Sequence, residues 1–343
     1  MIEKRTHIIL LFAAVFAFFG CQDQAQSQSK SVWVEQGILK TAQGPFFIKG
    51  VCYHPVAIGQ TKRSFERLSE DLKLMNEAGI NTIRVYEPID SEDVLDQIHQ
   101  AGISVITSFG YNQQGRYDLR SGSYLEYVTR FKDHPAILFW ELGNEYNYHP
   151  EWFGGTMDLW YATLAKAIKA IHQKDPGHPV ATAHGEVPTE QLLDQLAELD
   201  LWGLNVYRWD ESHKAIQDFK QISDKAVYFS ELGADSYMTA PKLGYQAGVN
   251  QKAQADALER MLAEILTPET SSAGVAIFSF TDGWWKAGYP DRQDVGGWAP
   301  GSSGVPYDGT ANEEYWGLVD INRNTKQAYR VVQSRFKSFN REK

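Results

Sequence analysis

The sequence predicts an α/β fold of the (β/α)8 or TIM barrel class, formed by a single domain. Short runs of apolar and β-branched residues alternate with longer amphipathic stretches, which is the pattern of repeated strand–helix units around a parallel sheet. Eight such runs follow one another without a long break. This number favours a closed barrel over an open, doubly wound sheet.

The eight predicted strands are rich in apolar and β-branched residues. Strands buried on both faces should be nearly continuous apolar runs, and segments 136–140 (AILFW) and 274–278 (GVAIF) meet this requirement. The predicted strands cover residues 46–53, 81–86, 104–109, 136–141, 180–183, 201–207, 226–231 and 275–280.

The stretches between the strands have the apolar spacing of helices that cover a sheet. Gly79 and Gly102 stand where two of these stretches end, and glycine commonly ends a helix. The predicted helices cover residues 65–78, 92–101, 123–132, 157–173, 190–196, 212–221, 251–266 and 325–339.

Two further segments lie outside the strand–helix repeat. Residues 32–34 and 38–41 flank Gln36-Gly37 and predict a short N-terminal β-hairpin that closes the bottom of the barrel. Residues 283–316 contain Gly, Pro, Trp and Tyr without periodicity, which predicts a long loop over the top face. A structureless loop of this length in a compact domain usually has a function.

The first twenty residues predict a signal peptide of the lipoprotein type. Lys4 and Arg5 precede the apolar run 8–19, and Gly20-Cys21 resembles a bacterial lipobox in which Cys21 is acylated. Residues 21–31 are rich in Gln and Ser and predict a flexible tether to a catalytic domain over residues 32–343. We therefore expect an exported protein, lipid-anchored on the periplasmic or cell-surface face of a bacterial membrane. The alternative is a soluble secreted protein cut near Ala25.

Composition and motifs exclude several classes of function. The net charge of −10 argues against nucleic acid as a partner, and no protein partner is indicated. No nucleotide-binding glycine pattern, serine-hydrolase elbow or His pair with metal-ligand spacing is present, so we expect no cofactor and no metal. With Cys21 acylated, Cys52 has no disulfide partner and is interpreted as a small core residue.

Two glutamates at predicted strand ends carry the chemistry. Glu145 follows the fourth strand after Asn144, and Glu231 ends the seventh. Barrel enzymes place their catalytic groups at the C-terminal ends of strands, and strands four and seven face each other across the barrel mouth. Retaining glycosidases need two carboxyl groups about 5 to 5.5 Å apart, one acting as acid/base and one as nucleophile.

With these two residues, the chain resembles the clan of retaining glycosidases built on (β/α)8 barrels, in which the catalytic glutamates follow strands four and seven. Segments 47–55, 81–84 and 316–320, with Lys326, are similar to the catalytic barrel of the β-galactosidase/β-glucuronidase/β-mannosidase family. Segment 203–207 (GLNVY) is also similar to β-1,3-glucanosyltransferases. The resemblance covers essentially the whole folded chain.

The resemblance implies a role for several residues. It makes Glu145 the acid/base, Glu231 the nucleophile and Asn144 a ligand of the sugar 2-hydroxyl. Arg84 and Tyr207 would keep the nucleophile ionised and oriented. Arg84 could instead form a simple core ion pair, and Glu141 is interpreted as a buried partner of a barrel cation. On strand eight, either Phe278 or Phe280 stands where the clan usually has a tryptophan, and Trp284 and Trp285 follow directly, so the residue that forms the sugar platform stays open.

Other residues at predicted strand ends complete the candidate substrate-binding set. His54 and His184 both lie near strand ends, where a hydrogen-bonded structural histidine is the commoner outcome, and we expect only His54 to line the sugar site. Asn205 lies in the GLNVY segment. Asp282, Trp284 and Trp285 follow strand eight at the active face, which favours sugar contact over packing.

The sequence thus predicts a retaining glycosidase or transglycosylase that acts on β-linked glycans, with β-1,3-glucan, β-galactosides and β-mannosides all open. The alternative is a non-catalytic sugar-binding lipoprotein that uses the same cleft. Such a protein would have no reason to keep both Glu145 and Glu231.

Overall fold

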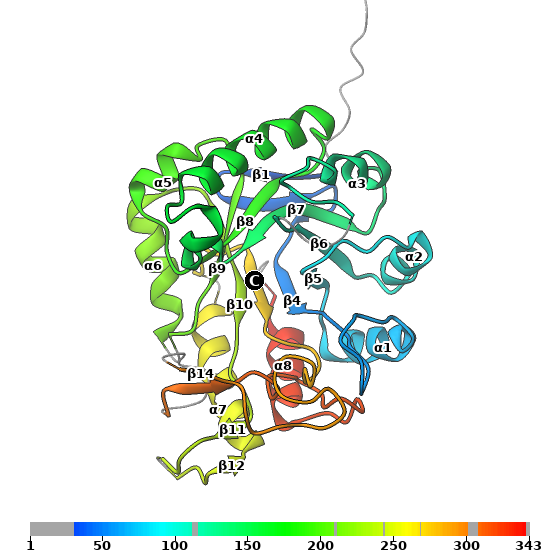
Figure 1. The fold of residues 1–343 in the computed structure, drawn as a ribbon, viewed down its shortest axis with the longest axis vertical. Coiled ribbons are helices and arrows are strands. Elements are labelled where there is room, and N and C mark those ends of the chain that lie inside the picture. Colours follow the sequence, from blue (N-terminus) through cyan, green and yellow to red (C-terminus); the bar gives the residue numbers. More distant parts are fainter. Residues whose placement is uncertain are drawn as a thin grey trace, which may run out of the picture.

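The computed structural model describes residues 31–340, apart from 112–115, 209–210, 243, 268 and 301–307. Eight parallel strands close into a barrel with helices around it, as the sequence predicts (Figure 1). The strands pair in the order β10-β13-β4-β5-β6-β7-β8-β9. They are β4 (Ile48–Cys52), β5 (Thr82–Val85), β6 (Ser104–Phe109), β7 (Ile137–Asn144), β8 (Val180–Gly185), β9 (Leu201–Asn205), β10 (Ala226–Leu232) and β13 (Gly274–Ile277).

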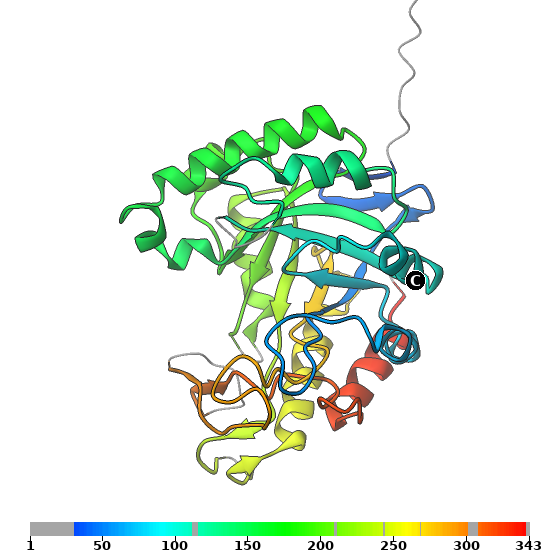
Figure 2. The same ribbon diagram turned by 45° about the vertical axis from the view of Figure 1, so that its right-hand side comes forward.

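The eight predicted helices are confirmed, and the bounds of strands and helices differ from the predicted ones by no more than three residues. Gly79 and Gly102 have φ angles of +78° and +73°, the left-handed conformation expected just after a helix. In Figure 2, α7 (yellow) and α8 (red) lie together on one side of the barrel. The helices are α1 (Leu68–Ala78), α2 (Glu92–Gln100), α3 (Tyr124–Phe131), α4 (Asp158–Lys174), α5 (Glu190–Gln195), α6 (His213–Ile222), α7 (Gln251–Ile265) and α8 (Gln327–Ser338).

The predicted N-terminal hairpin is present and closes the bottom of the barrel. Val32 of β1 (Val32–Glu35) and Leu39 of β2 (Ile38–Thr41) pack in one buried cluster with Ile48, Leu201 and Ala226. The last three residues begin barrel strands, so the hairpin covers the N-terminal end of the barrel. A short third strand, β3 (Gly44–Pro45), extends the hairpin.

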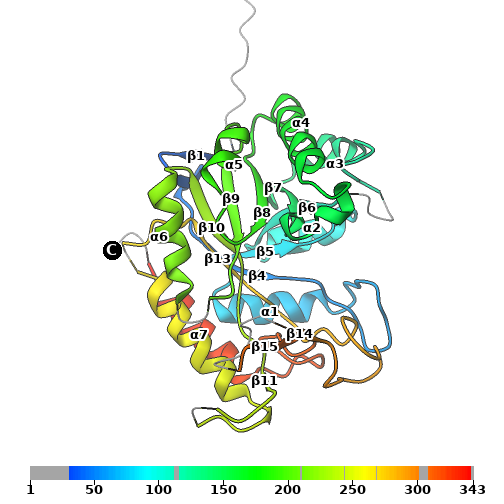
Figure 3. The same ribbon diagram turned by 60° about the vertical axis from the view of Figure 1, so that its left-hand side comes forward.

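The prediction that residues 283–316 form a structureless loop is wrong in part. Two short strands, β14 (Trp298–Pro300) and β15 (Thr310–Asn312), pair within it. They lie beside β11 (Tyr237–Met238) and β12 (Gly248–Val249), and the rings of Trp298 and Tyr237 are 5.4 Å apart (Figure 3). Strands of three residues are too short to show an alternating pattern, so the sequence gave no sign of them.

No helix within the described ranges is long and apolar enough to cross a membrane. The predicted signal peptide, Cys21 and nearly all of the predicted tether lie outside the described residues.

Candidate active site

The C-terminal ends of the barrel strands open onto a cavity of about 820 Å³. Residues at or after the ends of seven strands line it, which brings together side chains far apart in the sequence. They include Tyr86, Glu145, Glu186, Tyr207, Glu231 and Phe278. This end of a TIM barrel is where its enzymes carry their active sites.

The backbone at the end of β7 turns sharply before Glu145. Gly143 has a φ of +73°, and a Cβ atom there would lie 2.6 Å from the Trp160 ring, so glycine is required at this position. Glu145 itself adopts a left-handed conformation with φ of +55°. Its N–H donates to the carbonyl of Ala183 at 2.9 Å, and its carbonyl accepts from the N–H of Tyr148 at 3.0 Å. A non-glycine residue held in this conformation is often part of a functional site.

The carboxyl group of Glu145 is set up to hold a proton near neutral pH. Burial in the cavity wall, reinforced by the negative charge of Glu231, raises the pKa of Glu145 to about 7. A hydrogen bond from Asn205 acts in the opposite direction but does not outweigh burial. A carboxylic acid with this pKa is suited to general acid and base catalysis.

The carboxylate of Glu231 lies in a different environment, because three donors contact it. Oε1 accepts hydrogen bonds from Arg84 at 2.9 Å and from the hydroxyl of Tyr86 at 2.7 Å. Oε2 accepts one from the hydroxyl of Tyr207 at 2.7 Å. These three hydrogen bonds, one of them from a guanidinium, hold the carboxyl group of Glu231 in one orientation.

Arg84 connects Glu231 to the barrel interior. Its guanidinium is fully buried and donates from Nε to both oxygens of Glu141, at 2.9 and 3.1 Å. Glu141 also accepts from the hydroxyls of Ser108 and Tyr228. The interpretation of Glu141 as the buried partner of a barrel cation is therefore confirmed. Arg84 contacts Glu231 but does not line the cavity.

Two asparagines lie beside the glutamates, and both line the cavity. The side-chain oxygen of Asn144 accepts from Arg84 at 2.7 Å and from Asn205 at 3.1 Å. Ser230 in turn donates to the side-chain oxygen of Asn205 at 2.6 Å. These bonds fix the orientation of both amides and leave the NH2 group of Asn144 as its remaining donor.

His54 and Trp285 also line the cavity, and their ring centroids are 4.9 Å apart. Burial, followed by the positive charges of Arg63 and Lys286, lowers the pKa of His54 to about 4. The imidazole is therefore neutral at physiological pH. His184 lies outside the cavity lining, and its Nδ1 is 2.9 Å from the carbonyl of Glu186.

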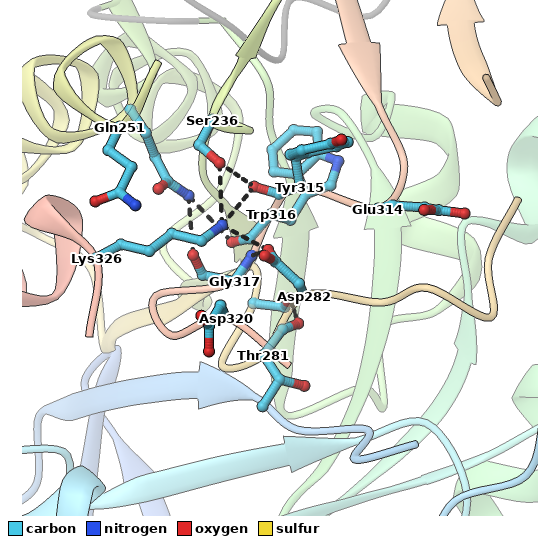
Figure 4. Close-up of polar contacts among 12 residues, drawn as sticks. Ser236, Gln251, Thr281, Asp282, Glu314, Tyr315, Trp316, Gly317, Asp320 and Lys326 are labelled. Atoms are coloured by element: carbon cyan, nitrogen blue, oxygen red, sulfur yellow. Dashed lines mark hydrogen bonds and ion pairs between the residues drawn. The ribbon is translucent and has the colours of Figure 1, made fainter. Parts of the chain in front are cut away.

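Asp282 and Trp284 do not line the cavity, so the expectation that they contact sugar is not supported by their placement. Asp282 is 3% exposed and forms a buried ion pair with Lys326 (Figure 4). The same oxygen accepts the N–H of Gly317 at 2.9 Å. An acid following strand eight was interpreted as a ligand group because the sequence did not show that Lys326 reaches it.

The ion pair between Asp282 and Lys326 holds the segment that carries Trp316. Lys326 also donates to the carbonyl of Tyr315 at 3.2 Å (Figure 4). Gln254 donates to the carbonyl of Trp316 at 3.3 Å. The Trp316 ring then lines the cavity, packed edge-on against Tyr207, with centroids 5.3 Å apart. The ion pair between Asp282 and Lys326 therefore affects the cavity indirectly, by positioning Trp316.

Of the two phenylalanines considered for the platform on strand eight, Phe278 lines the cavity, and its ring centroid is 5.3 Å from that of Trp316, whereas Phe280 is fully buried. The sequence did not single out Tyr86, although it lies two residues after Arg84 and so shares its face of the strand. Trp316 could not be found in this way, because a long loop carries it.

Cys52 is buried, in agreement with its interpretation as a core residue, and burial raises the pKa of its thiol to about 12. Its sulfur donates to the carbonyl of Ser230 at 3.4 Å. In the part of the chain that the structure describes, no group of three or more His, Cys, Asp or Glu side chains is placed to bind a metal ion.

Residues 32–240 match the model of the TIM barrel domain of glycosyl hydrolases family 2. The match covers more than half of the chain and includes Arg84, both glutamates and Tyr207. The chain belongs to glycosyl hydrolase family 2. The predicted resemblance to the β-galactosidase/β-glucuronidase/β-mannosidase family is thus confirmed.

Individual proteins with similar sequences have several different named activities. A β-galactosidase from Aeromonas hydrophila is 26% identical over 174 residues, 47% of this chain and 16% of that protein. A 1,3-β-glucanosyltransferase from Candida albicans is 26% identical over 233 residues, 57% of this chain and 50% of that protein. A mannan endo-1,4-β-mannosidase from Aspergillus clavatus is 44% identical over only 55 residues, 16% of this chain and 12% of that protein. This family 2 chain thus spans half or less of each relative.

Solved structures confirm the fold of the family 2 barrel. The β-glucuronidase of Faecalibacterium prausnitzii has a TM-score of 0.67 at 21% identity, over 90% of this chain and 52% of that one. A β-galacturonidase from Eisenbergiella tayi, bound to galacturonate, has a TM-score of 0.66 at 20% identity, over 90% and 55%.

Proposed function

We propose that this family 2 barrel is a retaining glycosidase for β-linked glycans, with Glu231 as nucleophile and Glu145 as acid/base. The observation that carries the proposal is the unequal environment of the two carboxyl groups. Burial and the charge of Glu231 raise the pKa of Glu145 to about 7, while the carboxyl group of Glu231 accepts three hydrogen bonds, one of them from the guanidinium of Arg84. One carboxyl group is ready to give a proton and the other to attack.

The reaction follows from these two states. Glu231 attacks the anomeric carbon while Glu145 protonates the departing glycosidic oxygen, which leaves a glycosyl ester on Glu231. Glu145, now ionised, takes a proton from water, whose oxygen displaces Glu231. The NH2 group of Asn144 binds the sugar 2-hydroxyl. Arg84, Tyr86 and Tyr207 orient the nucleophile throughout.

The cavity wall also offers groups for the rest of the sugar. Trp285 and Trp316 present aromatic surface to the cavity, a type of surface that packs against the apolar face of a sugar ring. Asn205 and His54 are two further polar members of the predicted binding set that line it. Relatives named for galactosidase, mannosidase and glucanosyltransferase activity support β-linked substrates as a class. Within this class, β-1,3-glucan and transfer to a sugar acceptor are the finer proposals.

The stereochemistry of the first product tests the proposed mechanism. Two displacements at the anomeric carbon should leave the β configuration of the substrate unchanged. Proton NMR during the first minutes, before mutarotation, should show the β anomer accumulating first on whichever substrate a panel of β-glucans, mannans and galactans identifies. Initial appearance of the α anomer would mean a single displacement.

The pH dependence should report Glu145. Because the protonated form is needed in the first step, kcat/KM should be maintained below the pKa of about 7 and fall about tenfold per unit above it. In Glu145→Gln, assayed on an aryl glycoside with an activated leaving group, this alkaline decline should disappear. If the decline persists in that variant, another group is the acid.

We also propose that Cys21 carries the lipid anchor that joins the exported barrel to a membrane, with residues 21–31 as its tether. Cys21 follows the apolar run and precedes the Gln/Ser-rich segment. Wild type should therefore fractionate with membranes and Cys21→Ala should not. Identical partition of both into the soluble fraction would contradict the anchor.

A further inference from the structure

The charges on the cavity wall are mostly negative. Among its described lining residues, Lys286 is the one Lys or Arg, and His54 is kept neutral by burial. Against Lys286 stand the four glutamates Glu87, Glu186, Glu231 and Glu313, and also Glu145, which is partly protonated near neutral pH because its pKa is about 7. This excess of negative charge would repel a negatively charged ligand that enters the cavity.

Lys286 is not available to neutralise such a ligand, because it already forms an ion pair with Glu313. Its Nζ atom lies 2.6 Å from an oxygen of Glu313 and 4.4 Å from the centroid of the Phe278 ring. The two charged side chains are 24% and 32% exposed, so solvent screens their attraction less than at an open surface. The ion pair presents no net charge to the cavity.

Two further cations close to the cavity are each outnumbered by acids, while a third, Arg63, donates to the backbone carbonyls of Glu87 and Pro88. Arg84 is shared between Glu141 and Glu231, two carboxyl groups for one guanidinium. Arg208 binds Glu186, which lines the cavity, at 2.5 Å, and also Asp218 at 2.7 Å. Each of these clusters is left with an excess of negative charge.

We propose that this cavity selects glycosides whose reacting sugar is uncharged, that it rejects uronides, and that Glu313 contributes to this selection by neutralising Lys286. The proposal rests on the proposed glycosidase function and adds its substrate class. In a uronide the C6 hydroxymethyl group is replaced by a carboxylate, and like charges brought together at a binding site repel each other. Structural neighbours named β-glucuronidase or β-galacturonidase share only the fold at this level of identity.

Two matched substrate pairs test the proposal: 4-nitrophenyl β-D-glucoside with the glucuronide, and the β-D-galactoside with the galacturonide. Each pair differs only at C6. Wild type should favour the neutral member in kcat/KM by about 100-fold or more, measured on the pair whose ring it accepts. Any uronide turned over faster than its neutral partner would overturn the inference.

The role of Glu313 is tested with the same substrates. Glu313→Gln removes one negative charge and frees Lys286, so the ratio of uronide to neutral kcat/KM should rise about tenfold. The gain should shrink at high salt, as expected for a charge effect. The double variant Lys286→Gln/Glu313→Gln should lose the gain, because the freed cation is gone. An unchanged ratio in Glu313→Gln, or a gain kept in the double variant, would overturn this role.

Glu198→Gln provides the matched control, since it also removes one acid from an ion pair, with Lys169 at 3.2 Å. Glu198 precedes β9 and so lies at the end of the barrel opposite the cavity. Its substrate ratio should equal that of wild type, and thermal unfolding should check the fold of each variant. Failure of wild type on all four aryl glycosides and on the glycan panel would contradict the glycosidase proposal itself. Preference for a uronide would contradict only the charge selection.

Discussion

Glu231→Ala should abolish turnover of every substrate, with a loss of kcat/KM on the order of 10⁴-fold or more. Without the carboxylate no glycosyl ester can form, and a better leaving group cannot compensate. The measurement is steady-state kinetics on a natural glycan and on an aryl glycoside. Glu190→Ala, on the exposed first turn of α5, is the control and should keep wild-type rates.

Glu145→Ala should behave differently, because Glu145 moves protons and forms no bond to carbon. Natural glycans, whose leaving oxygen needs a proton, should lose most of their turnover. Aryl glycosides with an activated leaving group should still form the glycosyl enzyme, so their first step should be much less affected. Equal losses on both substrate types would argue against the assignment of Glu145 as the acid.

Arg84→Met should have the second large effect, on stability as well as on activity. Arg84 is fully buried between Glu141 and Glu231, and removing it leaves two carboxyl groups without their cation. Loss of one partner of a buried ion pair costs about 3 to 5 kcal/mol of unfolding free energy. Urea denaturation should show this loss, and activity should fall because Glu231 loses one of its three donors.

Two further variants separate charge from geometry at Arg84. Arg84→Lys keeps the charge but cannot reproduce the forked contacts to Glu141, Glu231 and Asn144, so it should recover only part of the stability. Arg116→Met breaks an exposed pair with Asp90, in which Arg116 is 71% exposed, and should cost less than about 1 kcal/mol. Equal midpoints for Arg84→Met and Arg116→Met would refute the importance of the buried network.

The barrel could be predicted from the sequence because its strands are buried on both faces and therefore read as apolar runs. The positions of Glu145 and Glu231 followed from the same pattern, since each stands where such a run ends. For Arg84, the sequence predicted either a contact with the nucleophile or a core ion pair, but not that it makes both. The structure shows that one guanidinium contacts Glu141, Asn144 and Glu231 at once.

The parts that could not be predicted depend on contacts between distant segments. The sequence placed Asp282 near the active face. The ion pair with Lys326 instead buries Asp282 outside the cavity lining and holds the segment of Trp316, whose role the sequence did not show. The pairing of Lys286 with Glu313 joins the two ends of the long loop in the same way. No local pattern encodes such a contact.

Rescue of Glu145→Ala by azide tests the double displacement and both assigned roles most directly. The variant should accumulate the glycosyl ester on Glu231 from an activated aryl β-glycoside, and the space left by the missing side chain should admit azide on the β face. The account predicts restored turnover and a β-glycosyl azide, identified by proton NMR. A β-glycosyl azide formed by Glu231→Ala, with no rescue of Glu145→Ala, would show that the two roles are reversed.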